Sequence, residues 1–353
     1  DQLTAKFGRE ALAAGAVAQI EELTVAWVLA APDTQHSPTI ILEPGAAPPA
    51  ACTRLGTSDI WVYTATFPAG TARLWRCELN GAPRGEGRFE VYRTPAESRP
   101  QPGVPQGEVI QQPAWHSRIF PGTVRDWWLY VPAQYDGTHP ACFMVFQDGN
   151  GYRNHVPAVF DNLIAEGAMP VTLGIFINPG LFADTTVSNR SFEYDTLSNQ
   201  FSRYLLEEIL PDVGARYRLR EDAQAGAIGG SSSGGICSFT VAWQRPDRFR
   251  KVLSWVGSFT NIASGTTLRE GGHNYPALIR KAPTKPIRVY LQDGALDLDN
   301  ANGNWPLANQ EMAKALAFRE YDYQFVYGEG FHSQLHGRSV LPDALRWLWR
   351  GWR

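Results

Sequence analysis

The sequence predicts an α/β protein: a mostly parallel central sheet with helices on both faces, preceded by a small β-sandwich-like domain. Two observations predict this class. From residue 108 to residue 353, apolar strand-like runs alternate with amphipathic helical segments, as in strand–helix–strand units. Before residue 93, short β-type runs are separated by Pro, Gly and Asn, which favours antiparallel strands joined by turns.

The predicted N-terminal domain covers residues 1–92. Its first segment, residues 3–22, has the composition of a helix, and the runs LTVAWVLAA, TIILEP, IWVYTATF and TARLWRCEL that follow it indicate strands. Residues 93–107 contain four prolines and almost no large apolar side chain. We therefore expect them to form a linker that packs against nothing.

The predicted second domain covers residues 108–353. In chain order its expected strands are DWWLYVP, ACFMVFQDG, PVTLGIFINPG, AGAIGGS, KVLSWVGSF, PIRVYLQDG and YQFVYGEG. The expected helices are VPAVFDNLIAEG, LSNQFSRYLLEEILPDVGARY, a segment that begins near Ser233, NQEMAKALAFREY and LPDALRWLWR. In a parallel sheet, reactive groups lie in loops at the carboxyl ends of the strands.

Composition excludes several classes of function. The net charge is −3, and we find no basic run, no zinc-type Cys/His spacing and no long apolar segment. These features argue against a nucleic-acid partner, a metal site and a membrane span. Cys52 and Cys77 can pair within the N-terminal domain, whereas Cys142 and Cys237 lie in apolar runs that favour buried thiols. The chain begins at Asp1, and a periplasmic or secreted location is favoured over a cytoplasmic one.

A run of three serines carries the strongest signal for chemistry. Residues 230–234, GSSSG, match the G-x-S-x-G pattern of a sharp turn between a strand and a helix. The glycines allow the turn, and the central residue, Ser232, then projects its hydroxyl at the N-terminus of the helix. Ser232 is the candidate nucleophile, and the backbone N–H of Ser233 is a candidate oxyanion donor. The alternative is a Ser/Gly-rich connector without chemistry.

A serine nucleophile needs a histidine base, and three histidines follow Ser232. His332 comes directly after the last predicted strand, where the loop lies at the carboxyl edge of the sheet, and it is the preferred base. His336 could be its neighbour on a helical turn. His273 precedes every strand that could supply the acid. Any one of these histidines could instead be a structural residue.

The orienting acid is expected in VYLQDGALDLDN, just past a strand end. Asp297 is preferred because it lies far enough beyond the strand to reach over its edge, with Asp299 as the alternative. Asp293 is close to the strand and is expected to serve packing or the turn. A Ser–His pair without an acid is also compatible with the sequence.

The loop after ACFMVFQDG is expected to supply the second oxyanion donor. Gly149 allows the backbone to turn, so the N–H of Asn150 is the first choice and that of Gly149 the second. Asp148 could bind a substrate hydroxyl or cap the turn, and the sequence does not separate these roles.

At this point the residues resemble a known family. RIFPGTVRDWWLYVPAQYD, MVFQDGNGY, NRSFEYDT, EEILPDV, IGGSSSGG, LQDGALD and GEGFHS are similar to motifs of the enterochelin esterase-like branch of the serine esterases, which includes feruloyl and acetyl-xylan esterases and mycolyltransferases. The resemblance covers residues 108–353, and the N-terminal part looks like the β-sandwich that precedes the esterase domain in enterochelin esterases. It implies an α/β-hydrolase fold with Ser232, Asp297 and His332 as the catalytic set and Asn150 as an oxyanion donor. It also implies that Arg190 lies near the pocket with Glu193 holding it, although the two could form a purely structural ion pair.

These observations together predict a serine carboxylic-ester hydrolase that works through an acyl-enzyme without a cofactor. By resemblance, its substrates are esters of aromatic acids, acylated sugars or siderophore-type lactones. Two alternatives stay open: an acyltransferase that uses the same acyl-enzyme, and a binding protein on the same fold that does not turn over. The sequence predicts no oligomeric state.

Overall fold

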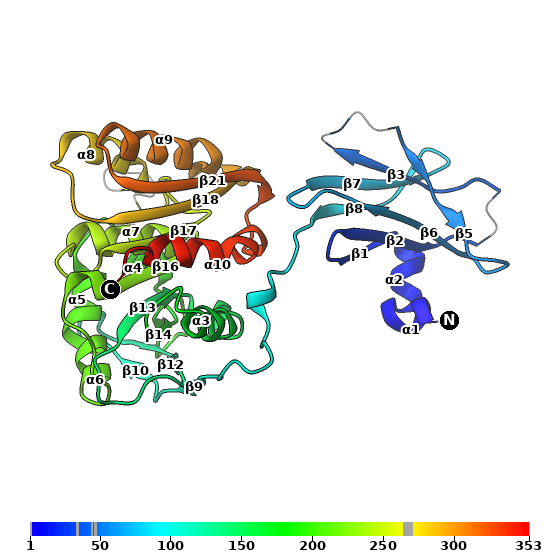
Figure 1. Ribbon diagram of the computed structural model, residues 1–353. Helices are drawn as coiled ribbons and strands as arrows, with labels where there is room; N and C mark the ends of the chain where they lie inside the picture. The colour runs from blue at the N-terminus through cyan, green and yellow to red at the C-terminus, as the bar shows by residue number, and fades with distance from the viewer. Residues whose placement is uncertain (1, 33–34, 44, 46–47, 264–270, 353) are drawn as a thin grey trace. The chain divides into compact units, whose positions relative to one another are not determined.

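The computed structural model describes residues 2–32, 35–43, 45, 48–263 and 271–352 (Figure 1). The chain divides into two compact units. The first comprises residues 1–94 and 329–331, and the second comprises residues 95–328 and 332–353. Antiparallel sheets dominate the first unit and a mostly parallel sheet dominates the second, so the predicted fold class is confirmed.

The N-terminal unit consists of two four-stranded antiparallel sheets and two short helices, α1 (Gln2–Phe7) and α2 (Arg9–Ala14). Its core is rich in aromatic side chains: Trp27 packs edge-on against Phe89 and Trp75, with ring centroids 5.6 and 6.3 Å apart. One sheet has the order β1 (Val17–Glu21), β2 (Thr24–Ala30), β6 (Ile60–Thr66), β5 (Thr53–Arg54). The other has the order β4 (Ala50–Ala51), β3 (Thr39–Glu43), β7 (Ala72–Leu79), β8 (Ala82–Glu90).

The helix expected over residues 3–22 is wrong in its second half. The helices end at Ala14, and β1 forms an antiparallel hairpin with β2. Gly8, with φ of +81°, interrupts the first helix, and a Cβ on Gly15 would lie 2.9 Å from the carbonyl oxygen of Arg84. Pairing with β2 decides the structure of residues 17–21, because local propensity is a weak guide where a partner strand is present.

All four cysteines are free and buried. Burial raises the pKa of the Cys52 and Cys77 thiols, to about 12 and about 11, so both stay protonated at neutral pH. The structure holds Cys52 and Cys77 as free thiols, so the pairing that the sequence allowed is not formed in it. Cys142 and Cys237 are core residues, as predicted.

The proline-rich segment packs against the second unit, contrary to the expectation of a free linker. The side-chain amide of Asn162 donates to the carbonyls of Glu97 and Arg99, at 2.8 and 3.0 Å. The Glu97 carboxylate pairs with Arg346 at 2.6 Å. Polar groups, which hydrophobicity patterns ignore, hold this segment in place.

The second unit is built on an eight-stranded sheet. Adjacent strands from β14 to β18 are parallel, whereas β12 is antiparallel to both of its neighbours. Strands β13, β14, β16 and β17 are buried along their whole length, as expected of a sheet covered on both faces. The strand order is β21 (Asp322–Phe331), β18 (Arg288–Leu296), β17 (Lys251–Trp255), β16 (Gly226–Ser231), β13 (Cys142–Gln147), β14 (Thr172–Ile177), β12 (Trp127–Val131), β9 (Glu108–Gln111).

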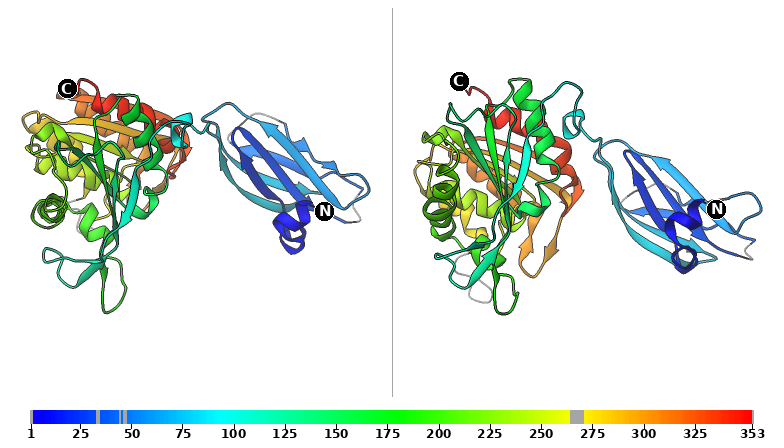
Figure 2. Two further views of the ribbon diagram at one scale, coloured as in Figure 1. Left: turned by 60° about the horizontal axis from the view of Figure 1, so that its bottom comes forward. Right: turned by 90° about the horizontal axis from the view of Figure 1, so that it is seen from below.

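Helices cover both faces of this sheet, as the two views in Figure 2 show. On one face lie α3 (Val156–Ala165) and α10 (Leu335–Trp349), which contact each other. The other face carries α4 (Arg190–Asp195), α5 (Gln200–Tyr204), α6 (Leu210–Gly214), α7 (Ser233–Gln244), α8 (Tyr275–Lys281) and α9 (Trp305–Phe318). None of the helices in the described ranges is long and apolar enough to cross a membrane.

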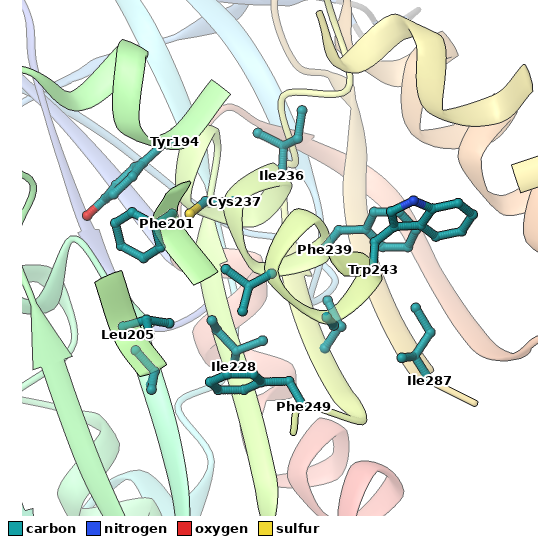
Figure 3. Packing of buried hydrophobic residues seen from close by; sticks show 14 of the residues in the cluster. Tyr194, Phe201, Leu205, Ile228, Ile236, Cys237, Phe239, Trp243, Phe249 and Ile287 are labelled. Carbon is teal, nitrogen blue, oxygen red and sulfur yellow. The ribbon is translucent and has the colours of Figure 1, made fainter. Parts of the chain in front are cut away.

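Helix α7 is the central helix of its face and is buried from Ser233 to Trp243. Figure 3 shows its side chains inserted among those of neighbouring elements, with Cys237 near Phe201 and Tyr194, and Trp243 beside Phe239. The rings of Phe239 and Trp243 stack with centroids 5.8 Å apart. This packing fixes the position of the helix, and with it the turn that precedes Ser233.

The second unit also contains two smaller sheets. A small sheet contains β10 (Trp115–His116), β11 (Thr123–Arg125) and β15 (Leu181–Phe182), and a hairpin contains β19 (Asp299–Asn300) and β20 (Gly303–Asn304). The long helix expected from residue 197 to residue 217 is present as a continuous helical run from Gln200 to Gly214, in which α5 and α6 are joined by a π-helical stretch, Leu205–Ile209.

Candidate active site

Ser232 occupies a strained turn between β16 and α7. Its φ of 58° and ψ of −124° lie in a region that non-glycine residues rarely adopt, at a cost of order 1–3 kcal/mol. Glycine is required by space at position 230, because a Cβ there would lie 2.7 Å from backbone atoms of Gly234. The turn is thus the sharp strand-to-helix connection that the motif predicts, and the flexible connector is excluded.

Ser232, His332 and Asp297 form a continuous chain of hydrogen bonds. Ser232 Oγ lies 2.9 Å from His332 Nε2, and His332 Nδ1 lies 2.5 Å from Asp297 Oδ1. The same Asp297 oxygen accepts the N–H of Leu298 at 2.6 Å. His332 follows the end of β21 and Asp297 follows the end of β18, so all three residues lie where strands end at the carboxyl edge. The Asp297 side chain is fully buried and that of His332 is 20% exposed.

The alternative acid and bases lie elsewhere. Asp299 is exposed in the β19–β20 hairpin, and His273 is exposed in a 3₁₀ turn, Gly272–Asn274. His336 is on α10, where its Nδ1 lies 3.1 Å from the side-chain nitrogen of Gln292 and burial lowers its pKa. Of these candidates, only His332 lies within hydrogen-bond distance of Ser232, and only Asp297 lies within that distance of His332.

Ser258 contacts the candidate nucleophile and Trp305 contacts Ser258, although the sequence did not single them out. Ser258 Oγ lies 3.1 Å from Ser232 Oγ, and the indole N–H of Trp305 donates to Ser258 Oγ at 3.2 Å. The Trp305 ring also lies edge-on to His332, with centroids 5.8 Å apart. Because an indole N–H can only donate, the Ser258 hydroxyl proton is free to point toward Ser232. No short motif marks either residue.

The two predicted oxyanion donors differ in their surroundings. Ser233 is the first residue of α7, where N–H groups have no partner within the helix. The N–H of Asn150, by contrast, donates to the side-chain oxygen of Asn178 at 3.0 Å. The sequence predicts Asn150 as an oxyanion donor. In the structure its N–H is already hydrogen-bonded to Asn178, a residue distant in sequence. Gly149, the second choice, is buried, and a Cβ there would lie 2.4 Å from the backbone nitrogen of Ile177.

Asp148 and Arg190 form an ion pair beside the turn. Arg190 Nε and Nη2 each lie 2.8 Å from one oxygen of Asp148. A Cβ on Gly234 would lie 3.3 Å from the Asp148 carboxylate, which places the pair next to the start of α7. The two side chains are 25% and 32% exposed. The Asp148 side chain is therefore held by Arg190 rather than used to cap its own turn.

Glu193 does not hold Arg190, which corrects both the positioning role and the ion pair expected between them. Its carboxylate forms two hydrogen bonds with Arg125 at 2.6 and 3.0 Å, and both side chains are fully buried. It also accepts the N–H of Gly180 and the side-chain amide of Asn189. Arg125 lies on β11, and no sequence spacing relates it to Glu193. A residue so enclosed supports the fold and is not placed to contact a substrate.

Asp195, at the end of α4, is a buried acid behind the turn. It is 2% exposed, and in the described part of the chain neither carboxyl oxygen has a well-formed hydrogen bond. Burial raises the pKa of Asp195 to about 7, and nearby Asp148 adds to this, while the Ser233 hydroxyl and Arg190 oppose it. The folded protein therefore resists ionising this group.

We expect Asp195→Asn to stabilise the protein at pH 8 but not at pH 4. A raised folded-state pKa contributes stability below about pH 4, which is lost as pH rises through about 7, whereas an asparagine does not titrate. A shift of roughly three pKa units corresponds to at most about 4 kcal/mol. Urea unfolding at both pH values measures the difference, with exposed Asp299→Asn as the control. An equal effect of Asp195→Asn at the two pH values would contradict the assignment.

Comparison with known proteins gives the family. A model of the family described as Putative esterase matches residues 121–348. Among curated proteins, the iron(III) enterobactin esterase of Dickeya dadantii (strain 3937) is 26% identical over 253 residues. That alignment covers 65% of this chain and 55% of the relative, so the chain spans about half the length of that protein.

Solved structures give the fold. The enterobactin esterase of Shigella flexneri, solved in the presence of enterobactin, superposes with a TM-score of 0.65 at 16% identity over 96% of each chain. A ferulic acid esterase from Anaeromyces mucronatus superposes with a TM-score of 0.56 at 16% identity, over 71% of this chain and 94% of the other. The α/β-hydrolase fold expected by resemblance is confirmed. Because the family model matches well over half of the sequence, the chain belongs to the Putative esterase family.

Proposed function

We propose that this chain hydrolyses carboxylic esters through an acyl-enzyme formed on Ser232. The observation that carries the proposal is the unbroken contact from Ser232 through His332 to Asp297, on a strained turn at the start of a buried helix. A serine hydroxyl is a poor nucleophile unless a base is positioned to take its proton, and the base needs a partner that fixes its tautomer. The three side chains meet these requirements.

In the proposed reaction, Ser232 Oγ attacks the ester carbonyl while His332 Nε2 takes the serine proton. Asp297 Oδ1 accepts a hydrogen bond from His332 Nδ1–H and stabilises the imidazolium. His332 then gives the proton to the leaving alcohol, which departs and leaves the acyl group on Ser232. Water attacks this acyl-enzyme with His332 again as base, and the acid is released.

The tetrahedral intermediates need donors for their negative oxygen. The N–H of Ser233 is one, supported by the N-terminal end of α7 and its dipole. Asn150 remains the proposed second donor, on condition that the Asn150 N–H leaves the Asn178 side-chain oxygen when substrate binds. Asn178 follows β14 and is half-buried, so this exchange requires only a side-chain rotation.

The proposed substrates are esters of aromatic acids, acylated sugars or siderophore-type lactones. The similarity to an enterobactin esterase and a ferulic acid esterase supports this range. Arg190 and Asp148, partly exposed beside the turn, are proposed to contact polar groups of the acid. We also propose a periplasmic or secreted location, which fractionation of cells that produce the protein would test.

A panel of esters with product analysis tests the proposal. The chain is incubated with p-nitrophenyl acetate, a feruloyl ester, an acetylated sugar and a catechol-bearing serine lactone, with Ser232→Ala as the matched control. We expect the parent protein to release the free acid from at least one ester. Ser232→Ala should release none. An added sugar alcohol that becomes acylated in preference to hydrolysis would favour the acyltransferase. No release from any ester, the activated one included, would contradict catalysis and favour a binding protein.

A further inference from the structure

A second buried carboxyl group, that of Asp293, lies close to Asp297. Asp293, within β18, is completely buried, and its carboxyl interacts with that of Asp297. Asp297 Oδ1 already binds His332 and the Leu298 N–H, which leaves Oδ2 for this contact. In the described part of the chain, Asp297 Oδ2 and both Asp293 oxygens are buried without a well-formed hydrogen bond from any donor.

Two ionised carboxylates cannot share such a contact away from water, because they repel and neither has a proton to donate. One proton placed between them removes both problems. Burial, followed by contact with Asp297, raises the pKa of Asp293 far above its usual range, and the Gly294 N–H and Asn309 oppose this only in part. Both N–H bonds of the Asn309 amide are committed to the carbonyls of Gly257 and Trp305, at 3.0 and 3.1 Å.

We infer that Asp293 is a positioning residue of the active site: as a neutral carboxylic acid it donates a hydrogen bond to Asp297 Oδ2 and so holds Oδ1 toward His332. This inference rests on the proposed function, because it assigns Asp297 the role of orienting the base. In this arrangement Asp297 Oδ1 binds His332, and Asp297 Oδ2 accepts the hydrogen bond from Asp293. It also leaves a single negative charge beside the imidazole.

The neighbours of Asp293 fit a neutral group. Asn309 reaches it from α9, and Tyr327 faces both aspartates from β21. Burial and the two aspartates raise the pKa of Tyr327, so the tyrosine is neutral as well. Across Asp297 lies His332, the group on which the single charge acts. None of these residues, as placed, brings a positive charge that would stabilise an ionised Asp293.

Two substitutions separate a positioning role from simple packing. Asp293→Leu removes the donor, and we expect kcat to fall by about 10- to 100-fold with KM little changed, the loss typical of one hydrogen bond to a charged group. Asp293→Asn supplies a neutral N–H donor of the same shape and should recover most of that loss. Asp299→Asn, on an exposed residue of the same loop, is the control. If the asparagine variant is as slow as the leucine variant, the donor role is wrong.

The pH profile of Asp293→Asn distinguishes a neutral from an ionised Asp293. Replacing a neutral acid with a neutral amide leaves the charge near His332 unchanged, so the acidic limb of kcat/KM should stay where it is. Replacing an ionised Asp293 would remove a negative charge that favours the imidazolium, and the limb would move to lower pH. That movement would overturn the inference. Asp297→Asn is the reference variant that should produce it.

An infrared difference spectrum tests the protonation state without turnover. At pH 8, the parent protein should show the carbonyl stretch of a protonated carboxylic acid that Asp293→Asn lacks. Asp195, with a pKa of about 7, is largely ionised at this pH and does not obscure the band. A protein with the band but no esterase activity would refute the proposed function and leave the carboxyl pair intact. An active protein without the band would refute the inference alone.

Discussion

Ser232→Ala is expected to abolish ester hydrolysis, with a loss of kcat on the order of a million-fold. Ser232 is the one serine of the GSSSG turn whose hydroxyl contacts His332, so its loss removes the atom that attacks the ester. Rates with p-nitrophenyl acetate measure the effect. Thermal unfolding of the same variant checks that the fold is kept.

The neighbouring serines provide matched controls in the same turn. Ser231 Oγ accepts a hydrogen bond from Gln334 at 3.0 Å, and the Ser233 hydroxyl faces Asp195, so neither hydroxyl is directed at the histidine. Ser231→Ala and Ser233→Ala should keep most of the activity, because an alanine at position 233 retains the backbone N–H. Near-normal turnover by Ser232→Ala, with loss in either control, would show that the nucleophile is misassigned.

His332→Ala should be as damaging as the loss of the serine, because members of a catalytic triad act as a unit and their losses do not add. The double variant Ser232→Ala/His332→Ala should therefore be no slower than Ser232→Ala alone. Steady-state rates of the three variants, measured with the same activated ester, make the comparison.

Two other histidines act as controls for the base. His273→Ala removes an exposed ring, and His336→Ala removes one bonded to Gln292, so both should be mild. A further large drop in the double variant would mean that Ser232 and His332 do not share a step.

The parts of the site that lie within one turn were predictable from sequence. The G-x-S-x-G pattern specifies its own backbone shape, because only glycine fits at position 230, and that shape places Ser232 at the start of α7. His332 was preferred because it directly follows a strand end, which is also a local feature. The choice between Asp297 and Asp299 was open, because it depends on how the chain turns after β18.

Contacts between residues far apart in the chain could not be predicted. Asn150 gives its N–H to Asn178, and Glu193 pairs with Arg125, 68 residues away, rather than with Arg190. The sequence predicts a packing or turn role for Asp293, because the pattern does not show that both carboxyls are buried together. The predicted end of the first helix is wrong for a related reason: pairing with β2 outweighs the helical composition of residues 17–21.

Covalent labelling tests most directly the central claim that Ser232 is a nucleophile activated by His332. The protein is treated with diisopropyl fluorophosphate, digested, and the modified peptide identified by mass spectrometry. We predict one label on Ser232, none in Ser232→Ala, and much slower labelling in His332→Ala. A label on another residue, or labelling of Ser232→Ala as fast as the parent protein, would contradict the claim.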